Sequence, residues 1–203
     1  SPRQIALIGK QLITGMKYLH SKGYLFVDTK PANFMTSTAN NLENIKFVDF
    51  GCCERYIAYN GRHRPLVQRG SPVGTPEFLS LDAHRGLEPS RKDDMESLAL
   101  TLLSLVTGGK LPWGTATSDS QCKSAKESCD ISELSSKLGV PELGTMIEIC
   151  RRLKYDEVPP YETFLAKMDA LAIRETASAG RGSVLVAPDQ RRRRVDASDA
   201  RHR

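Results

Sequence analysis

The chain has 203 residues, of which 39% are hydrophobic and 26% are charged, and its formal net charge is +5 at pH 7. This length and apolar content suit one ordinary domain and exclude a collagen-like or wholly disordered chain. The longest nearly apolar run, residues 98–106, is far shorter than the roughly 20 residues of a membrane-spanning helix, so we expect a soluble protein without a membrane partner.

Apolar spacing in the first third of the chain predicts a helix, two β-rich segments and a long loop. The helix covers residues 3–21 and ends near Gly23. The β-rich segments, 24–27 and 45–48, lie on either side of a polar turn and predict a small hairpin. The loop covers residues 54–73 and has the composition of a functional connection.

Helices dominate the rest of the chain. Residues 93–107 are apolar nearly all round, which predicts a central buried helix ending at Gly108-Gly109. Further helices are expected at 131–138, 141–154 and 160–173. The predicted fold class is therefore mainly α, of the α+β type, in one domain over residues 1–173.

Positive charge is concentrated in the last thirty residues. Residues 174–203 contain eight Arg against four Asp or Glu, so they carry +4 of the net charge, and they have little apolar content. We expect a disordered basic tail that contacts nucleic acid weakly at most. Its run Arg191–Arg194 is compatible with a nuclear localisation signal, a polyanion contact or a solvated tail. The five Cys form no CxxC pair, which favours reduced thiols and a cytoplasmic or nuclear location.

Polar residues follow each β-rich segment. Asp28, Lys30 and Asn33 come after the first, and Asp49-Phe50-Gly51 comes after the second. A carboxylate can orient a hydroxyl group and take its proton, which suits Asp28, and a cation beside a phosphate suits Lys30. Mg²⁺ prefers the hard oxygen ligands that Asn33 and Asp49 offer. The spacing favours phosphoryl transfer from ATP with Mg²⁺.

With other motifs in the same order, these residues resemble the large C-terminal lobe of a eukaryotic-type protein kinase, over roughly residues 3–173. The other motifs are Tyr18-Leu19-His20, Gly74-Thr75-Pro76-Glu77-Phe78, Ser80-Leu81-Asp82-Ala83-His84, Ser90-Arg91-Lys92-Asp93-Asp94-Met95-Glu96-Ser97, Leu111-Pro112-Trp113 and Cys150-Arg151-Arg152-Leu153-Lys154-Tyr155. The Ser-Leu-Asp stretch stands where most kinases have Ala-Pro-Glu, and it is similar to the casein kinase 1 and vaccinia-related kinase group.

The resemblance implies a serine/threonine kinase that phosphorylates proteins, with a role for each residue. Asp28 would be the catalytic base and Lys30 a contact to the transferred phosphate. Thr75 would hydrogen-bond both of them and line the acceptor site. Asp94 would anchor the backbone amides of the catalytic loop.

For the cofactor, the resemblance implies that Lys30, Asn33, Met35 and Asp49 contact Mg·ATP. Asn33 and Asp49 would be the metal ligands, and Met35 would form the floor beneath adenine.

The chain departs from the family pattern in two ways. Phe26-Val27 replaces the His-Arg pair before the catalytic Asp, so Phe26 should fill the apolar stack behind Asp-Phe-Gly, and control by an activation-loop phosphate is not expected. No Gly-rich phosphate loop, Val-Ala-Ile-Lys lysine or partnering helix Glu is present. We therefore expect the small N-terminal lobe to lie in a longer parent protein, and this chain alone to be weakly active or inactive.

Other interpretations of the same residues stay open. Asp28 and Asp49 are also suited to cap strand ends, and Met35 to fill a core. The basic residues of the long loop suit either an acidic or phosphorylated substrate or plain solvation; they are Arg62, His63, Arg64 and Arg69. Cys52 and Cys53 are either reactive thiols or inert ones. The whole chain could also act as a pseudokinase scaffold, or bind polyanions through its tail.

Overall fold

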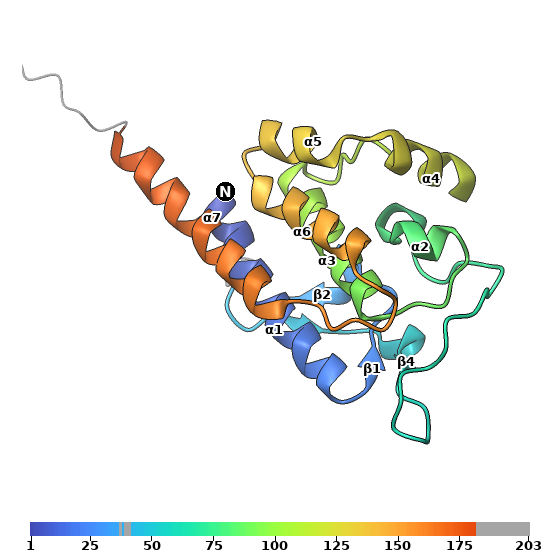
Figure 1. The fold of residues 1–203 in the computed structure, drawn as a ribbon. Helices are drawn as coiled ribbons and strands as arrows, with labels where there is room; N and C mark the ends of the chain where they lie inside the picture. The colour runs from blue at the N-terminus through green and yellow to red at the C-terminus, as the bar shows by residue number, and fades with distance from the viewer. Residues whose placement is uncertain (37, 39–41, 182–203) are drawn as a thin grey trace, which may run out of the picture.

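The computed structural model describes residues 1–36, 38 and 42–181, and it is mainly helical (Figure 1). The α-helices are α1 Pro2–Ser21, α2 Leu81–His84, α3 Arg91–Val106, α4 Asp119–Ser128, α5 Ile131–Lys137, α6 Pro141–Arg152 and α7 Tyr161–Arg181. The 3-10 helices are η1 Pro31–Asn33, η2 Phe50–Cys52 and η3 Pro76–Phe78. The strands are β1 Tyr24–Leu25, β2 Phe34–Met35, β3 Lys46–Phe47 and β4 Glu54–Arg55.

Helix α1 begins where the sequence provides a cap and carries one apolar stripe. The Gln4 amide N–H donates to the Ser1 hydroxyl, the Gln4 side chain accepts from the Ser1 amine at 2.7 Å, and Pro2 occupies the first turn. The apolar stripe packs against α7 and α3 (Figure 1). Gly15 allows the close approach of β3, because a Cβ atom there would lie 2.5 Å from the Phe47 ring.

Helix α3 is the centre of the core, as its continuous apolar pattern predicts. Residues 92–104 are all buried, including the charged side chains of its first turns. Ser90 and Asp93 form a capping box at its start, and Gly108 and Gly109 follow its end with positive φ angles. Helices α1 and α6 pack against it. Its first turns also lie close to the loops between the strands, where its polar residues can reach them.

The strands pair differently from the prediction. The two β-rich segments do not form one hairpin: Tyr24–Leu25 pairs with Glu54–Arg55, and Lys46–Phe47 pairs with Phe34–Met35, both antiparallel. Each strand has two residues, which is too short for an alternating pattern to identify its partner. The hairpin is therefore β2–β3, and β1–β4 is a second ladder.

The C-terminal end also differs from the prediction. Helix α7 continues to Arg181, so the first eight residues of the basic segment 174–203 are helical. The run Arg191–Arg194 lies outside the described residues. Two further helices, α2 and α4, have no counterpart among the predicted elements.

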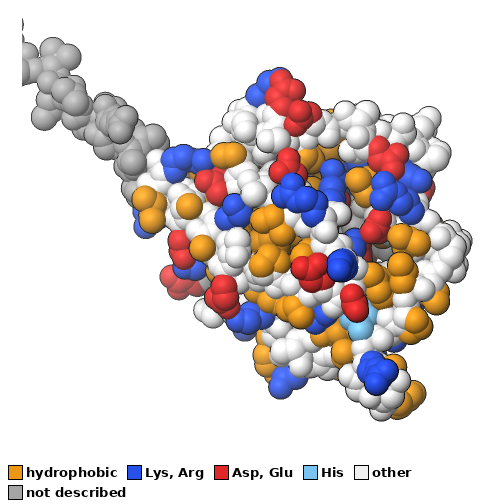
Figure 2. Space-filling model, in the orientation of Figure 1, with side chains coloured by type: hydrophobic (Ala, Val, Ile, Leu, Met, Phe, Trp, Pro, Cys, Tyr) orange, Lys and Arg blue, Asp and Glu red, His pale blue; other side chains and the backbone are white. Residues whose placement is uncertain are grey.

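Charges are mixed over the surface. On the face drawn in Figure 2, Lys and Arg side chains alternate with Asp and Glu side chains and with apolar ones. No large patch of one sign is visible on that face. Within the described ranges, no helix combines the length and the apolar character that crossing a membrane would require.

Candidate active site

The loop that follows β1 is anchored to the start of α3. The Asp94 carboxylate accepts hydrogen bonds from the backbone N–H groups of Phe26 (2.7 Å) and Val27 (2.8 Å), and it lies 2.9 Å from the His20 ring. Val27 has a φ of 69°, a conformation that is costly for a β-branched residue. The buried Asp94 holds this strained turn in place, as expected for an anchor of the loop.

Phe26 fills an aromatic stack behind the Asp49-Phe50-Gly51 segment, as predicted. Its ring centroid lies 5.3 Å from that of Phe47, 5.5 Å from that of Phe50 and 5.8 Å from that of Phe34. Phe26 is 1% exposed. The stack joins both strands of the β2–β3 hairpin to the catalytic loop, and so fixes the position of Asp49 relative to Asp28.

Asp28, Lys30 and Thr75 form one connected group. The Lys30 ammonium lies 2.6 Å from one Asp28 oxygen, and the Thr75 hydroxyl and amide N–H donate to the other at 2.9 and 3.0 Å. The Lys30 ammonium also donates to the Thr75 hydroxyl at 3.2 Å. Thr75 is 45 positions from Lys30 and 47 from Asp28 in the chain, and the fold brings it into the contacts with both that the resemblance implies.

The electrostatics of this group keep the carboxylate ionised. Burial raises the pKa of Asp28, but the hydrogen bonds from Lys30 and Thr75 together with the charge of Lys30 outweigh it, and the net shift is downward. The pKa of Lys30 is raised, chiefly by its hydrogen bond to Asp28, and also by the charges of Asp28 and Asp49. At neutral pH the site holds an ion pair beside a hydroxyl group.

Asn33 and Asp49 offer the hard oxygen atoms predicted for a metal. The Asn33 amide nitrogen donates to the Asp28 carbonyl at 2.8 Å, which leaves the Asn33 side-chain oxygen for another partner. Asp49 is exposed, with a φ of 57°, and accepts from the Gly51 N–H at 3.3 Å. The Val48 N–H donates to the Asn33 carbonyl at 3.0 Å, which ties the two segments together.

This donor set fits Mg²⁺ held jointly with phosphate oxygens. Among the described residues, no group of three or more His, Cys, Asp or Glu side chains could hold a metal by itself. Mg²⁺ usually binds through one or two carboxylates while keeping waters and substrate phosphates as ligands. One amide and one carboxylate are sufficient for that mode.

Apolar side chains at the same end of the molecule are open to solvent. Met35, on β2, is 56% exposed, and Phe50 is 53% exposed. Met35 therefore does not fill the core of the described structure. It is available as a flat apolar contact for a planar ring or for another segment of protein.

Two of the four basic residues named above for the long loop are paired with carboxylates within the chain. Arg69 forms ion pairs with Glu54 and Glu88, and Arg64 pairs with the same two carboxylates. Hydrogen bonds from Arg69, the largest effect, and the charges of both arginines lower the pKa of Glu54. The charges of Arg64 and Arg69 are therefore neutralised in place, which favours an internal role for these two residues over capture of an acidic substrate.

The five cysteines are free thiols. Burial, in each case the largest effect, raises the pKa of every one, and that of Cys53 reaches about 11. Thiolate forms are therefore suppressed at neutral pH, which favours the inert interpretation of Cys52 and Cys53.

Sequence reasoning missed the role of three residues in this part of the molecule. Glu54 and Glu88 carry no motif, and their pairing with the loop arginines depends on the fold. Lys126 lies on the unpredicted helix α4 and contacts the carbonyl groups of Pro76 and Leu79. The one available signal was the spacing of Cys122 and Lys126, which places them on one helix face.

The family model described as the protein kinase domain matches residues 1–168. The matched range includes Asp28, Lys30, Asn33, Asp49 and Thr75, and it covers most of the chain.

Proposed function

The chain belongs to the protein kinase family, and from this premise we propose that it is the large lobe of a casein kinase 1-like serine/threonine kinase, which transfers the γ-phosphate of ATP to hydroxyl groups of proteins. The observation that carries the proposal is the contact of Asp28 with both Lys30 and the Thr75 hydroxyl. A scaffold without chemistry has no need of this combination.

The proposed chemistry assigns one task to each side chain. Asp28 orients the acceptor hydroxyl and takes its proton as the hydroxyl oxygen bonds to the γ-phosphorus and the bond from that phosphorus to ADP, the leaving group, breaks. Lys30 turns from Asp28 toward the transferred phosphate, whose negative charge it offsets. Thr75 holds the Asp28 carboxylate in the orientation that the acceptor needs.

Asn33 and Asp49 would hold the metal of Mg·ATP through their side-chain oxygens. When bound, Mg²⁺ neutralises phosphate charge and fixes the geometry of the triphosphate. Met35 would contact the adenine ring on one face.

We also propose that a small lobe covers this end of the molecule in the working enzyme. The exposure of Met35 and Phe50 supports this, because large apolar side chains at a nucleotide site are usually shielded. The 203-residue chain should then bind ATP weakly, since one face of the ring would stay in water.

A non-catalytic scaffold is the second candidate. It is favoured by Phe26-Val27 at the position of the family's His-Arg pair. Both candidates predict the same fold, so activity must separate them.

The test is transfer of labelled γ-phosphate by the natural protein that contains this sequence, to an array of Ser, Thr and Tyr peptides. Asp28→Asn should lower turnover by about 10²–10⁴-fold, because an amide cannot take the proton. Asp169→Asn, an exposed site that pairs with Lys10, is the matched control. Label on Tyr peptides alone would exclude Ser/Thr specificity, and transfer by Asp28→Asn at the wild-type rate would exclude the mechanism.

A further inference from the structure

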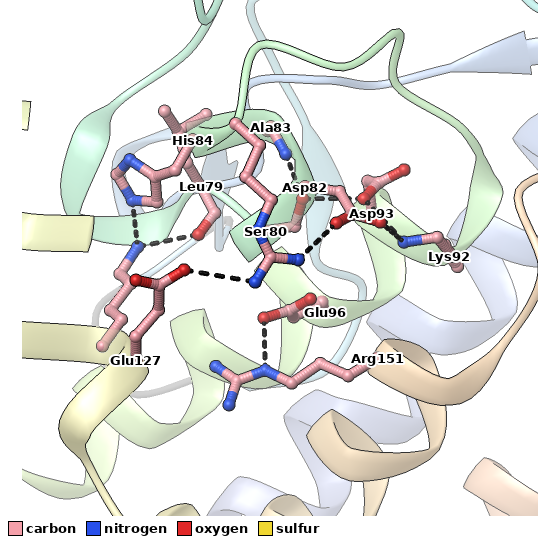
Figure 3. A network of polar contacts seen from close by, with 12 residues as sticks. Leu79, Ser80, Asp82, Ala83, His84, Lys92, Asp93, Glu96, Glu127 and Arg151 are labelled. Carbon is pink, nitrogen blue, oxygen red and sulfur yellow. Dashed lines mark hydrogen bonds and ion pairs between the residues drawn. The ribbon is translucent and has the colours of Figure 1, made fainter. Parts of the chain in front are cut away.

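Lys126 is a buried lysine whose bonds hold a functional segment. Its side chain is 0% exposed, although lysine is among the residues least often buried. The ammonium group donates to the carbonyl oxygens of Pro76 at 2.8 Å and Leu79 at 2.7 Å, and lies 3.0 Å from His84 Nε2. In Figure 3, dashed lines join the His84 ring and the Leu79 carbonyl to the same nitrogen atom.

The tautomer of His84 is fixed by its other neighbour. His84 Nδ1 lies 2.7 Å from an Asp119 carboxylate oxygen, which can only accept, so the proton belongs on Nδ1. His84 Nε2 then faces Lys126 as an acceptor. The three hydrogens of a protonated Lys126 thus meet three acceptors, and a neutral amine would leave one of them without a donor.

The segment held in this way connects directly to the candidate acceptor site. The segment is residues 75–79, which are η3 and the residue on each side of it. It begins at Thr75, whose hydroxyl donates to Asp28 at 2.9 Å. Trp113 Nε1 donates to the Glu77 carbonyl at 2.8 Å. Side chains from outside therefore hold three of the four carbonyl groups of residues 76–79, and Lys126 provides two of these contacts.

A cavity of about 300 Å³ lies between this segment and α4. Its lining includes Thr75, Pro76, Glu77, Trp113, Asp119 and Cys122. Because the cavity opens beside Thr75, its shape affects how an acceptor chain would lie. The bonds from Lys126 fix one wall of the cavity to the other.

We propose that Lys126 is a positioning residue for phosphate transfer, and that its protonated form clamps residues 75–79 in the arrangement that presents an acceptor to Asp28. The inference rests on the proposed kinase function and adds a mode of regulation to the same site. Loss of the proton on Lys126 would loosen the segment without touching the nucleotide side of the site.

The surroundings of Lys126 place this proton near the physiological range. Burial lowers the pKa of Lys126 to about 8. The titratable and charged groups that face it come from α2, α3, α4 and α6, and they are His84, Glu96, Asp119, Cys122 and Arg151. Burial, followed by the charge of Lys126, lowers the pKa of His84, which keeps that ring neutral as an acceptor.

The first experiment measures backbone order without any need for activity. Amide hydrogen exchange at Phe78 and Leu79 is compared between the wild-type chain, Lys126→Met and Lys92→Met. Lys92 is a matched control, because it is also a buried lysine but pairs with Asp82 and Asp93. Lys126→Met should speed exchange at these amides about tenfold or more, because two buried carbonyls lose a charged donor. Equal exchange in the two variants overturns the clamp.

The second experiment uses the natural protein and its best peptide acceptor. Lys126→Met should raise KM for the peptide about tenfold and leave KM for ATP unchanged. In the wild type, KM for the peptide should rise as pH increases through about 8, and in Lys126→Met it should stay level. A pH profile shared by both proteins, or an equal rise in both KM values, overturns the proposal.

The proposal stays testable if Lys126→Met does not fold or if the wild type is inactive. If Lys126→Met fails to fold, Asp119→Asn at the exposed start of α4 releases the His84 tautomer and should give a smaller increase in exchange at Leu79; no increase overturns the clamp. If the wild type transfers no phosphate, the proposed function fails, while the exchange experiment still decides whether Lys126 orders the segment.

Discussion

Asp94 and Asp49 are the same residue type in two neighbouring regions, and they differ in what surrounds their oxygen atoms. Asp94 is buried at the start of α3 and contacts His20 and the amide groups of Phe26 and Val27. Asp49 is exposed and accepts a single described hydrogen bond, from the nearby Gly51 N–H. The Asp94 carboxylate is occupied by contacts within the protein, and the Asp49 carboxylate is available to a ligand.

This difference suits the two carboxylates to different tasks in one site: Asp94 to stability and Asp49 to chemistry. A carboxylate whose lone pairs are occupied by backbone amides holds a loop, because removing it leaves buried donors unsatisfied. A carboxylate with free lone pairs can coordinate a metal and adds little to folding. Substitutions in the two regions should therefore have opposite signatures.

The largest expected effect on folding is that of Asp94→Asn. The amide group keeps one acceptor oxygen but turns donor hydrogens toward the backbone amides, so we expect a loss of about 3 kcal/mol of unfolding free energy. For a domain of this size that corresponds to a decrease in Tm of about 6–12 °C. Thermal unfolding by circular dichroism measures it, with Asp169→Asn as the exposed control. A Tm equal to that of the control would mean that Asp94 is not an anchor.

Asp49→Asn tests the other side of the comparison. Asn tolerates the left-handed backbone at this position, so the Tm should change little. Mg²⁺-dependent nucleotide affinity should fall at least about 100-fold, equivalent to about 2.7 kcal/mol, since altering even an outer-shell partner of a metal typically costs 10–100-fold. Isothermal titration of the natural protein with Mg·ATP measures this. Unchanged affinity would remove Asp49 from the site.

Phe26 lies between the two regions, so Phe26→Leu should slightly lower both the unfolding free energy and the nucleotide affinity. A leucine keeps most of the apolar volume but loses the ring contacts with Phe47 and Phe50, so we expect about 1 kcal/mol of destabilisation. Nucleotide affinity should fall less than in Asp49→Asn, because Asp49 is displaced but not removed. Denaturant unfolding and the same titration measure the two quantities. A larger loss of affinity than of stability would show that the stack serves the site more than the fold.

The smallest expected effect is on the acid stability of the Asp28 group. Because the folded-state pKa of Asp28 is lowered, its contribution is complete above its usual value of 3.8 and is lost as pH falls through the lower folded value. The difference in unfolding free energy between wild type and Asp28→Asn should therefore stay constant from pH 7 to about 5 and shrink below about 4. A difference that grew in acid would contradict the ion pair with Lys30.

The sequence predicted the parts of the fold that depend on local pattern. Helices α1 and α3 follow from their apolar spacing and caps, and the position of Phe26 follows from the motif that it precedes. The strand partners were not predictable, because two-residue strands carry no register signal. Helix α4 was missed because it is polar, and its contacts with η3 come from two buried side chains, Cys122 and Lys126.

The candidate site was predictable as a set of residues and in part as a set of contacts, since Thr75 meets Asp28 and Lys30 as expected. The order of Asp28, Lys30, Asn33 and Asp49 predicted phosphoryl transfer, which stays a prediction. Which side-chain oxygen atoms are available to a ligand, such as those of Asn33 and Asp49, depends on the fold. The fold also decided that Arg64 and Arg69 meet Glu54 and Glu88 rather than a ligand.

That cluster of two arginines and two glutamates has a consequence for how such an enzyme is turned on. Glu54 begins the long loop, and Glu88 follows the end of α2. The ion pairs of Arg64 and Arg69 therefore tie the loop both to its own start and to the segment after α2. An added phosphate commonly performs this fastening by drawing arginines toward new negative charge. Here the negative charge is encoded in the chain, and partial burial weakens its screening by salt. These ion pairs form as the chain folds, so the loop is tied in place without an added phosphate.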